Sequence, residues 1–128
     1  MALKYPRGTI LLVSQVPDKN GVNPKDRFVV LIRDFDDADT LAYGVAVTGT
    51  FNLPLPATSV RLPYQRQGRC KTGLNKDSIA DCTWIVVAAS QDLGKRNGIT
   101  PPIQLLTILQ QVQNHLPPPP PPATASGS

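Results

Sequence analysis

Short apolar runs separated by turn-forming residues fill most of the chain. Each run carries β-branched and aliphatic side chains, and clusters of proline, glycine, asparagine or aspartate lie between the runs. Runs of this length with such boundaries are typical of buried strands. Two prolines precede the fourth run, so that strand should be short or lie at a sheet edge. The expected strands are residues 7–14, 28–32, 41–50, 59–62 and 78–89, the last as one or two strands.

The C-terminal part of the chain predicts one helix. Apolar residues recur there at helical spacing and form one stripe, which would pack on the sheet. Thr100 is a suitable N-cap, and Pro101 suits the first helical position. The proline run 117–122 should end the helix, because proline lacks an N–H. The stripe consists of Leu105, Ile108, Leu109, Val112 and Leu116.

Several short strands followed by one helix indicate a mostly β fold, a small, partly open barrel that the helix closes. The length of 128 residues fits one domain. We expect the folded domain at residues 1–116 and a proline-rich, disordered tail at 117–128, with polyproline II geometry in the prolines. A proline run can also be a ligand of SH3 or WW domains, but we favour the interpretation as a tail or spacer.

The composition argues against a membrane protein, a secreted protein and a metal centre. The longest apolar runs fall short of the ~18 residues of a spanning helix, and the N-terminal segment lacks the apolar core of a signal peptide. We therefore expect a cytoplasmic protein without a membrane partner. Cys70 and Cys82 are expected to be reduced thiols rather than a disulfide. With His115 as the only histidine, no Cys/His metal site is expected.

Positive charge is concentrated in one segment. The net charge is +4, and no acidic residue lies between Arg61 and Lys76. Residues 64–75 are expected to form a loop, so this basic segment would be exposed and would suit a polyanion such as RNA. An ordinary solvated loop explains the same pattern equally well. The basic residues of the segment are Arg61, Arg66, Arg69, Lys71 and Lys76.

The residue types available for chemistry are arginine, threonine, lysine and aspartate. The only histidine lies at the end of the expected helix, glutamate is absent, and no glycine motif for phosphate binding occurs. This set suits cleavage of a phosphodiester without a metal, because arginine can donate two hydrogen bonds to a developing phosphorane. In RNA the substrate's own 2′-OH can be the nucleophile, so the protein need only position and stabilise.

Four segments in a fixed order resemble the MazF/PemK family of toxin endoribonucleases. They are Arg7-Gly8-Thr9-Ile10, Arg27 before the apolar run 28–31, Thr48 at the end of a strand, and Gly73 to Ser78. The resemblance covers about residues 5–115. It implies an SH3-like barrel of the CcdB/PemK type that forms a homodimer.

The resemblance also implies a function and partners. The protein would be the toxin of a type II toxin–antitoxin system and would cleave single-stranded RNA, often mRNA, leaving a 2′,3′-cyclic phosphate and a 5′-hydroxyl. A cognate antitoxin protein would block its groove, and no cofactor or metal would be needed. Arg27 matches the catalytic arginine of the family, Thr48 its transition-state threonine, and Asp77 an acidic position that is the general base in some members. Lys76 matches a basic position near the RNA.

The residues expected to bind RNA are Lys25, Arg66, Arg69, Lys71 and Lys76. The catalytic residues also have plainer interpretations. Arg27 could be a solvated arginine, Thr48 an ordinary strand residue, and Asp77 a turn or cap residue. Trp84 is expected in the core or at a dimer interface rather than as a stacking platform for RNA.

The chain departs from the family pattern at three places. Phe28 follows the arginine where the family usually has proline, Asn75 stands where one branch has a catalytic arginine, and Val22-Asn23 stands where many members have Glu-Gln. An alternative function is therefore a catalytically weakened protein of the same fold that binds RNA or an antitoxin without cutting.

Overall fold

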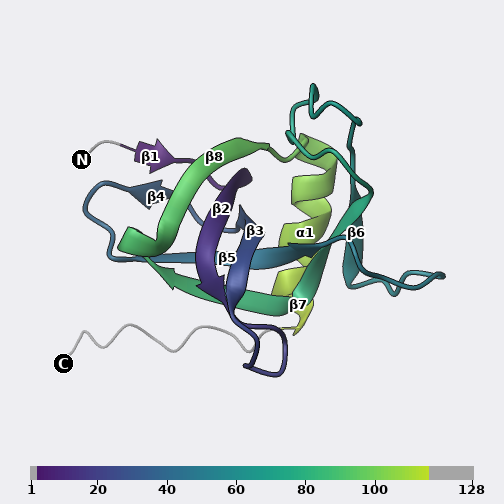
Figure 1. Ribbon diagram of the computed structural model, residues 1–128, viewed down its shortest axis with the longest axis horizontal. Helices are drawn as coiled ribbons and strands as arrows, with labels where there is room; N and C mark the ends of the chain where they lie inside the picture. Colours follow the sequence, from purple (N-terminus) through teal and green to yellow (C-terminus); the bar gives the residue numbers. More distant parts are fainter. Residues whose placement is uncertain (1–2, 116–128) are drawn as a thin grey trace.

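The computed structural model describes residues 3–115, which form eight strands, one short 3-10 helix and one α-helix (Figure 1). Strands predominate, as the apolar runs predicted, and the helix follows the last strand. All strand pairs are antiparallel. The elements are β1 (Leu3–Tyr5), β2 (Thr9–Val16), β3 (Lys25–Leu31), β4 (Phe35–Asp36), β5 (Leu41–Thr48), β6 (Ser59–Leu62), β7 (Ser78–Ala89), η1 (Ser90–Asp92), β8 (Leu93–Ile99) and α1 (Pro102–His115).

Six strands form one sheet in the order β6-β7-β5-β3-β2-β8, and β1 pairs with β4 in a separate two-stranded sheet. The central strands β2, β3 and β5 are apolar on both faces, because both faces of the sheet are covered. Residues opposite each other in an antiparallel pair point to the same face. Ile10, Val30 and Val45 are aligned by the pairing and are buried together.

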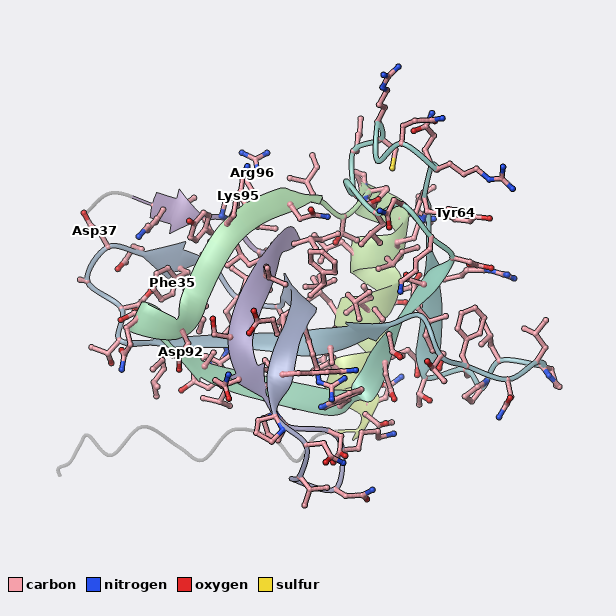
Figure 2. All side chains as sticks on the ribbon, in the orientation of Figure 1. Phe35, Asp37, Tyr64, Asp92, Lys95 and Arg96 are labelled. Atoms are coloured by element: carbon pink, nitrogen blue, oxygen red, sulfur yellow. The ribbon has the colours of Figure 1, made fainter. Side chains whose placement is uncertain are left out.

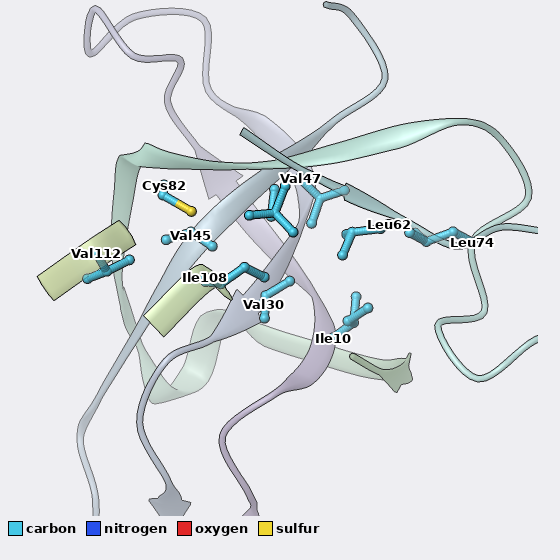
Figure 3. Packing of buried hydrophobic residues seen from close by; sticks show 11 residues of the cluster. Ile10, Val30, Val45, Val47, Leu62, Leu74, Cys82, Ile108 and Val112 are labelled. Atoms are coloured by element: carbon cyan, nitrogen blue, oxygen red, sulfur yellow. The ribbon is translucent and has the colours of Figure 1, made fainter. Parts of the chain in front are cut away.

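The core consists of two apolar clusters on opposite faces of this sheet. The first, which contains Val30 and Val45, also receives Ile108 and Val112 from α1 (Figure 3). The second contains Leu11, Val29 and Ala46, which are likewise aligned across β2, β3 and β5. Each central strand therefore contributes alternate residues to two cores, which explains why its sequence is continuously apolar rather than alternating.

The two edges of the sheet, β6 and β8, are brought together by other segments. Helix α1 packs against β6 and β7. The loop between β6 and β7 reaches β8, where the Ile99 N–H donates a 2.7 Å hydrogen bond to the Lys71 carbonyl. The predicted fold, a small, partly open barrel closed by a C-terminal helix, is confirmed.

The predicted start of the helix is wrong by one residue. The helix begins at Pro102, and the Leu105 N–H donates to the Pro101 carbonyl at 2.9 Å, so Pro101 rather than Thr100 is the capping residue. An N-cap side chain accepts from the N–H two or three residues on. For Thr100 these positions are Pro102, which has no N–H, and Ile103, with which the Thr100 hydroxyl makes no bond. The Thr100 N–H donates a 2.8 Å hydrogen bond to the carbonyl of Gly8, the residue before β2, and the Thr100 hydroxyl has no hydrogen-bond partner.

Three strands were not predicted from the apolar pattern. β8 contains Gly94, Lys95, Arg96, Asn97 and Gly98, which are poor strand formers, and it forms because it pairs with β2 at the sheet edge. β1 and β4 are short, and β4 lies among the turn-forming aspartates between two of the predicted strands. Phe35 of β4 is buried and stacks on Tyr5, with 6.3 Å between the ring centroids.

The remaining expectations concern the cysteines, membrane-spanning helices and the C-terminal tail. Cys70 and Cys82 are both free thiols, as expected, and burial raises the pKa of the Cys82 thiol to about 11. No helix among the described residues is long and apolar enough to cross a membrane. The expectations for Leu116 and for the tail at 117–128 concern residues outside the described range.

Ile108 is fully buried in the first cluster, whereas Leu106 on the same helix is 58% exposed. We expect Ile108→Ala to lower the free energy of unfolding by about 2–5 kcal/mol, because the lost contacts leave a cavity. Leu106→Ala is the matched control and should change it by less than about 1 kcal/mol. Urea denaturation followed by Trp84 fluorescence measures both, and equal effects would contradict the assignment of α1 to the core.

Candidate functional site

A groove of about 310 Å³ lies where the start of β3, the end of β5 and the segment before β7 meet. We call it the Arg27 groove. Four residues predicted from the sequence line it together, Lys25 and Arg27 from β3, Thr48 from β5 and Lys76 before β7. Asp26, Asn75 and Ser78 contribute further polar groups. Residues from distant parts of the sequence thus form one polar, mostly basic site.

The Arg27 side chain is fixed by contacts with residues that do not themselves line this groove. Its Nε donates a 3.0 Å hydrogen bond to the Val16 carbonyl, and its Nη2 donates to the Asn23 carbonyl at 3.4 Å. Its guanidinium carbon also lies 4.9 Å from the centroid of the Trp84 ring. These two bonds use two of the five N–H donors of a guanidinium, so the others remain available to an anion. Arg27 is therefore fixed rather than solvated at random.

One acceptor, the Asn23 carbonyl, lies in the loop between β2 and β3, which Asp18 organises. The other belongs to Val16, the last residue of β2. The Asp18 carboxylate accepts from the Asn20 and Val22 N–H groups at 2.9 and 3.1 Å and from the Asn23 side-chain amide at 3.2 Å. These donors, the Val22 N–H first, hold the pKa of Asp18 below its usual value. Asn23 itself adopts a left-handed conformation with φ of 54°, which asparagine tolerates better than most residues.

Trp84 reaches Arg27 because β7 is irregular. Val45 of β5 is opposite Ile85, whereas the next residue, Ala46, is opposite Asp81, so extra residues of β7 bulge out between them. Bulges commonly redirect a side chain near a site. Trp84 is half-buried and packs against the second cluster, at the edge of the core, and it also supports the guanidinium.

The groove is also lined by Thr48, Lys76 and Ser78. The Thr48 hydroxyl accepts a 3.1 Å hydrogen bond from the Thr50 N–H at the end of β5. The stem of Lys76 passes over Gly49, where a Cβ would lie 3.4 Å from the lysine Cε. Ser78 is buried and donates to the Lys76 carbonyl at 3.0 Å. Sequence reasoning did not assign Ser78, because a serine that begins a strand carries no distinctive signal.

Asp77 is bound by an arginine outside the groove. Both of its carboxylate oxygens accept from Arg61 of β6. The Arg61 side chain holds the pKa of Asp77 below its usual value, and Asp77 in turn raises the pKa of Arg61. The pair neutralises one charge of the basic segment. An aspartate that is deprotonated and paired in this way is a weak proton acceptor.

The basic residues fall into two groups. Lys25 and Lys76 line the Arg27 groove. Arg66, Arg69 and Lys71 are exposed in the loop between β6 and β7, which projects beyond Tyr64 at the upper edge of the molecule (Figure 2). These three do not line the Arg27 groove. Across residues 3–115, no three His, Cys, Asp or Glu side chains gather in a way that could hold a metal ion.

Solved structures of MazF toxins have the same fold as this chain. The toxin MazF-mt6 of Mycobacterium tuberculosis has a TM-score of 0.59 and 20% identity, over 81% of this chain and 92% of that chain. An endoribonuclease from a mycobacterial species has a TM-score of 0.61 and 12% identity, over 85% and 88%. The MazE–MazF structure from Deinococcus radiodurans has a TM-score of 0.57 and 10% identity, over 89% and 95%. No protein-family model and no curated protein matches the chain.

Asp18 is expected to be a positioning residue for Arg27. Asp18→Ala should free the Val22 N–H and loosen the loop, so hydrogen exchange of this amide should speed up. In the wild type, protection should be full above the ordinary pKa of an aspartate and should decline as the pH falls through the lowered pKa of Asp18 in the folded state, because the protonated carboxyl is a poorer acceptor. Asp37→Ala, in the exposed loop after β4, is the control. Equal exchange in both variants would contradict the role of Asp18.

Proposed function

We propose that this protein is a MazF-like toxin of a type II toxin–antitoxin pair, an endoribonuclease that cuts single-stranded RNA without a metal. The observation that carries the proposal is the fixed guanidinium of Arg27, a residue that lines one groove together with Thr48 and two lysines. The shared fold with MazF toxins supports it. The sequence resemblance had indicated the same residues.

The proposed reaction uses the nucleophile of the substrate. The 2′-oxygen forms a bond to the adjacent phosphorus and the bond to the 5′-oxygen breaks, which gives a 2′,3′-cyclic phosphate and a 5′-hydroxyl. One proton leaves the 2′-OH and one is delivered to the 5′-oxygen. The free N–H groups of Arg27, with the Thr48 hydroxyl, would stabilise the extra negative charge on the phosphorane. Lys25 and Lys76 would attract the RNA backbone.

Asp77 remains our candidate for the general base, but we expect it to be a weak one. Its ion pair with Arg61 and its lowered pKa make it a poor proton acceptor. Charge stabilisation by Arg27 would therefore supply most of the rate acceleration, because oxyanion-type stabilisation is usually the largest single contribution. Arg61→Gln would free the carboxylate and raise its pKa, so this variant should cleave no more slowly than the wild type.

Two partners follow from the proposal. One is a cognate antitoxin, because a mycobacterial endoribonuclease and the Deinococcus MazF that share this fold were solved with their antitoxins. The other is a second copy of this chain in a homodimer, as the sequence resemblance implies. Since mRNA is the proposed substrate, we expect the protein to act in the cytoplasm.

The competing function is RNA or antitoxin binding without cleavage. It is favoured by Asn75, which lines the Arg27 groove where one branch of the family has a catalytic arginine. Incubation of the purified protein with a mixed RNA pool in EDTA distinguishes the two functions. Discrete new ends that carry cyclic phosphates support the toxin, whereas binding without new ends supports the alternative.

Arg27→Ala should lower the cleavage rate by about 10²-fold or more, because a key donor to the transition state is lost. Arg33→Ala is the matched control. Arg33 also lies over an aromatic ring, 4.7 Å from the centroid of Tyr43, but it is outside the groove. Its loss should leave cleavage within about twofold of the wild type.

Cleavage rates of both variants are measured on the same RNA, and circular dichroism verifies that both proteins are folded. Arg27→Lys is informative as a third variant. It keeps the charge but loses the forked geometry of the guanidinium, so it should recover only a small part of the rate. A folded Arg27→Ala protein that cleaves as fast as Arg33→Ala would refute the catalytic role.

A further inference from the structure

A second groove of about 430 Å³ adjoins the Arg27 groove. We call it the β8 groove. One wall is β8, through Lys95, Arg96 and Asn97, and the other is the loop between β6 and β7, through Gln67, Gly68 and Gly73. Phe28 and Asn75 line both grooves. The two grooves therefore adjoin at these two residues, and a chain-like ligand that passes over them could contact both.

The walls of the β8 groove are fixed to each other. The Asn97 side-chain amide donates a 3.0 Å hydrogen bond to the Thr72 carbonyl, next to the backbone bond between Ile99 and Lys71. A Cβ at Gly98 would lie 2.2 Å from the Lys71 carbonyl oxygen, and one at Gly73 would lie 2.1 Å from the Asn97 carbonyl oxygen. Only glycine permits such close contact, so this groove is formed in advance of any ligand.

The charges around the β8 groove are positive. Lys95 and Arg96 are exposed on β8 (Figure 2), and no carboxylate is among the residues that line this groove. Arg66 and Arg69 flank its lining residues Gln67 and Gly68 in the loop. Arg66 and Arg69, which do not line the Arg27 groove, are thus sequence neighbours of residues that line the β8 groove. Such a site favours a polyanion.

Phe28 provides an aromatic surface at the junction. It is half-buried, and it packs against the first core cluster while it lines both grooves. Its backbone is fixed by pairing with Leu12 in β2. A supported aromatic ring beside basic side chains is the combination that binds single-stranded nucleic acid, because bases stack on the ring and phosphates contact the cations.

We propose that the β8 groove binds the part of the single-stranded RNA that continues beyond the cleaved phosphate, with a base stacked on Phe28 and phosphates on Lys95 and Arg96. This inference rests on the proposed function, because it extends the same substrate along the surface. It also gives a role to Phe28, the residue that stands where the family usually has proline.

The test uses fluorescently labelled 2′-O-methyl RNA of random sequence, which lacks the nucleophile and cannot be cleaved. Oligonucleotides of about four and about ten nucleotides span the range of site sizes for single strands. Dissociation constants come from fluorescence anisotropy between about 50 and 200 mM salt. The wild type should bind the long oligonucleotide more tightly than the short one, because only the long one reaches the β8 groove.

The double variant Lys95→Gln/Arg96→Gln should reduce this advantage and flatten the salt dependence by about 1.4 in logarithmic slope, as expected for two phosphate contacts on a single strand. Its matched control is Lys4→Gln/Arg33→Gln, which removes two exposed charges that do not line either groove. Phe28→Leu should weaken binding of the long oligonucleotide roughly tenfold, and Phe28→Tyr should restore it.

RNA cleavage by the wild type is measured in parallel, so that the two proposals can fail separately. If the protein cleaves RNA but the Lys95/Arg96 and control variants bind both oligonucleotides alike, the β8 groove is not part of the RNA site. If the wild type neither cleaves nor binds RNA, both proposals are wrong. Loss of the length advantage in a protein that does not cleave supports the β8 groove together with the binding function.

Discussion

The burial of β3 on both faces is the constraint on which the rest of the structure depends. Alternate residues of this strand enter the two apolar clusters, Val30 on one face and Val29 on the other. The same alternation continues to the exposed start of the strand. The Arg27 side chain lies on the same face of the sheet as Val29 and contacts Trp84. The Phe28 side chain lies on the same face as Val30 and packs against the first cluster. A register shift of one residue would exchange these faces, so the packing of the core also fixes the site.

Much of this fold could be predicted from the sequence, because the apolar runs are long enough to dominate local preference. Where the secondary structure depends on tertiary pairing, the sequence pattern did not predict it. β8 is a strand only because β2 lies beside it, and Thr100 is not the cap because the helix begins one residue later than predicted. The same distinction applies to the residues of the site. Lys25, Arg27, Thr48 and Lys76 were predicted and do line one groove, whereas the Arg61–Asp77 pair joins residues that no local pattern connects.

The ion pair of Asp77 and the contacts that hold the Arg27 guanidinium have opposite effects on catalysis. The Arg27 guanidinium is held by two backbone carbonyls and an aromatic face, groups that take no part in proton transfer. The ion pair occupies both oxygens of the carboxylate that would accept a proton. A site of this kind is strong in charge stabilisation and weak in base catalysis. Substrate binding energy from a longer RNA would then be valuable, because it can position the 2′-OH without a strong base.

Phe28 shows how the chain replaces a missing preorganising residue. Proline after Arg27 would restrict the backbone of that arginine directly. In this chain the backbone is instead restrained by the pairing of Arg27 with Val13 and of Phe28 with Leu12. The side chain is restrained by the Val16 carbonyl of β2 and by the Asn23 carbonyl of the Asp18-organised loop. Preorganisation is thus distributed over the strand pairing and the loop. Position 28 is thereby released for an aromatic ring, and that ring lies at the junction of the two grooves, where proline would offer no extended face for a base.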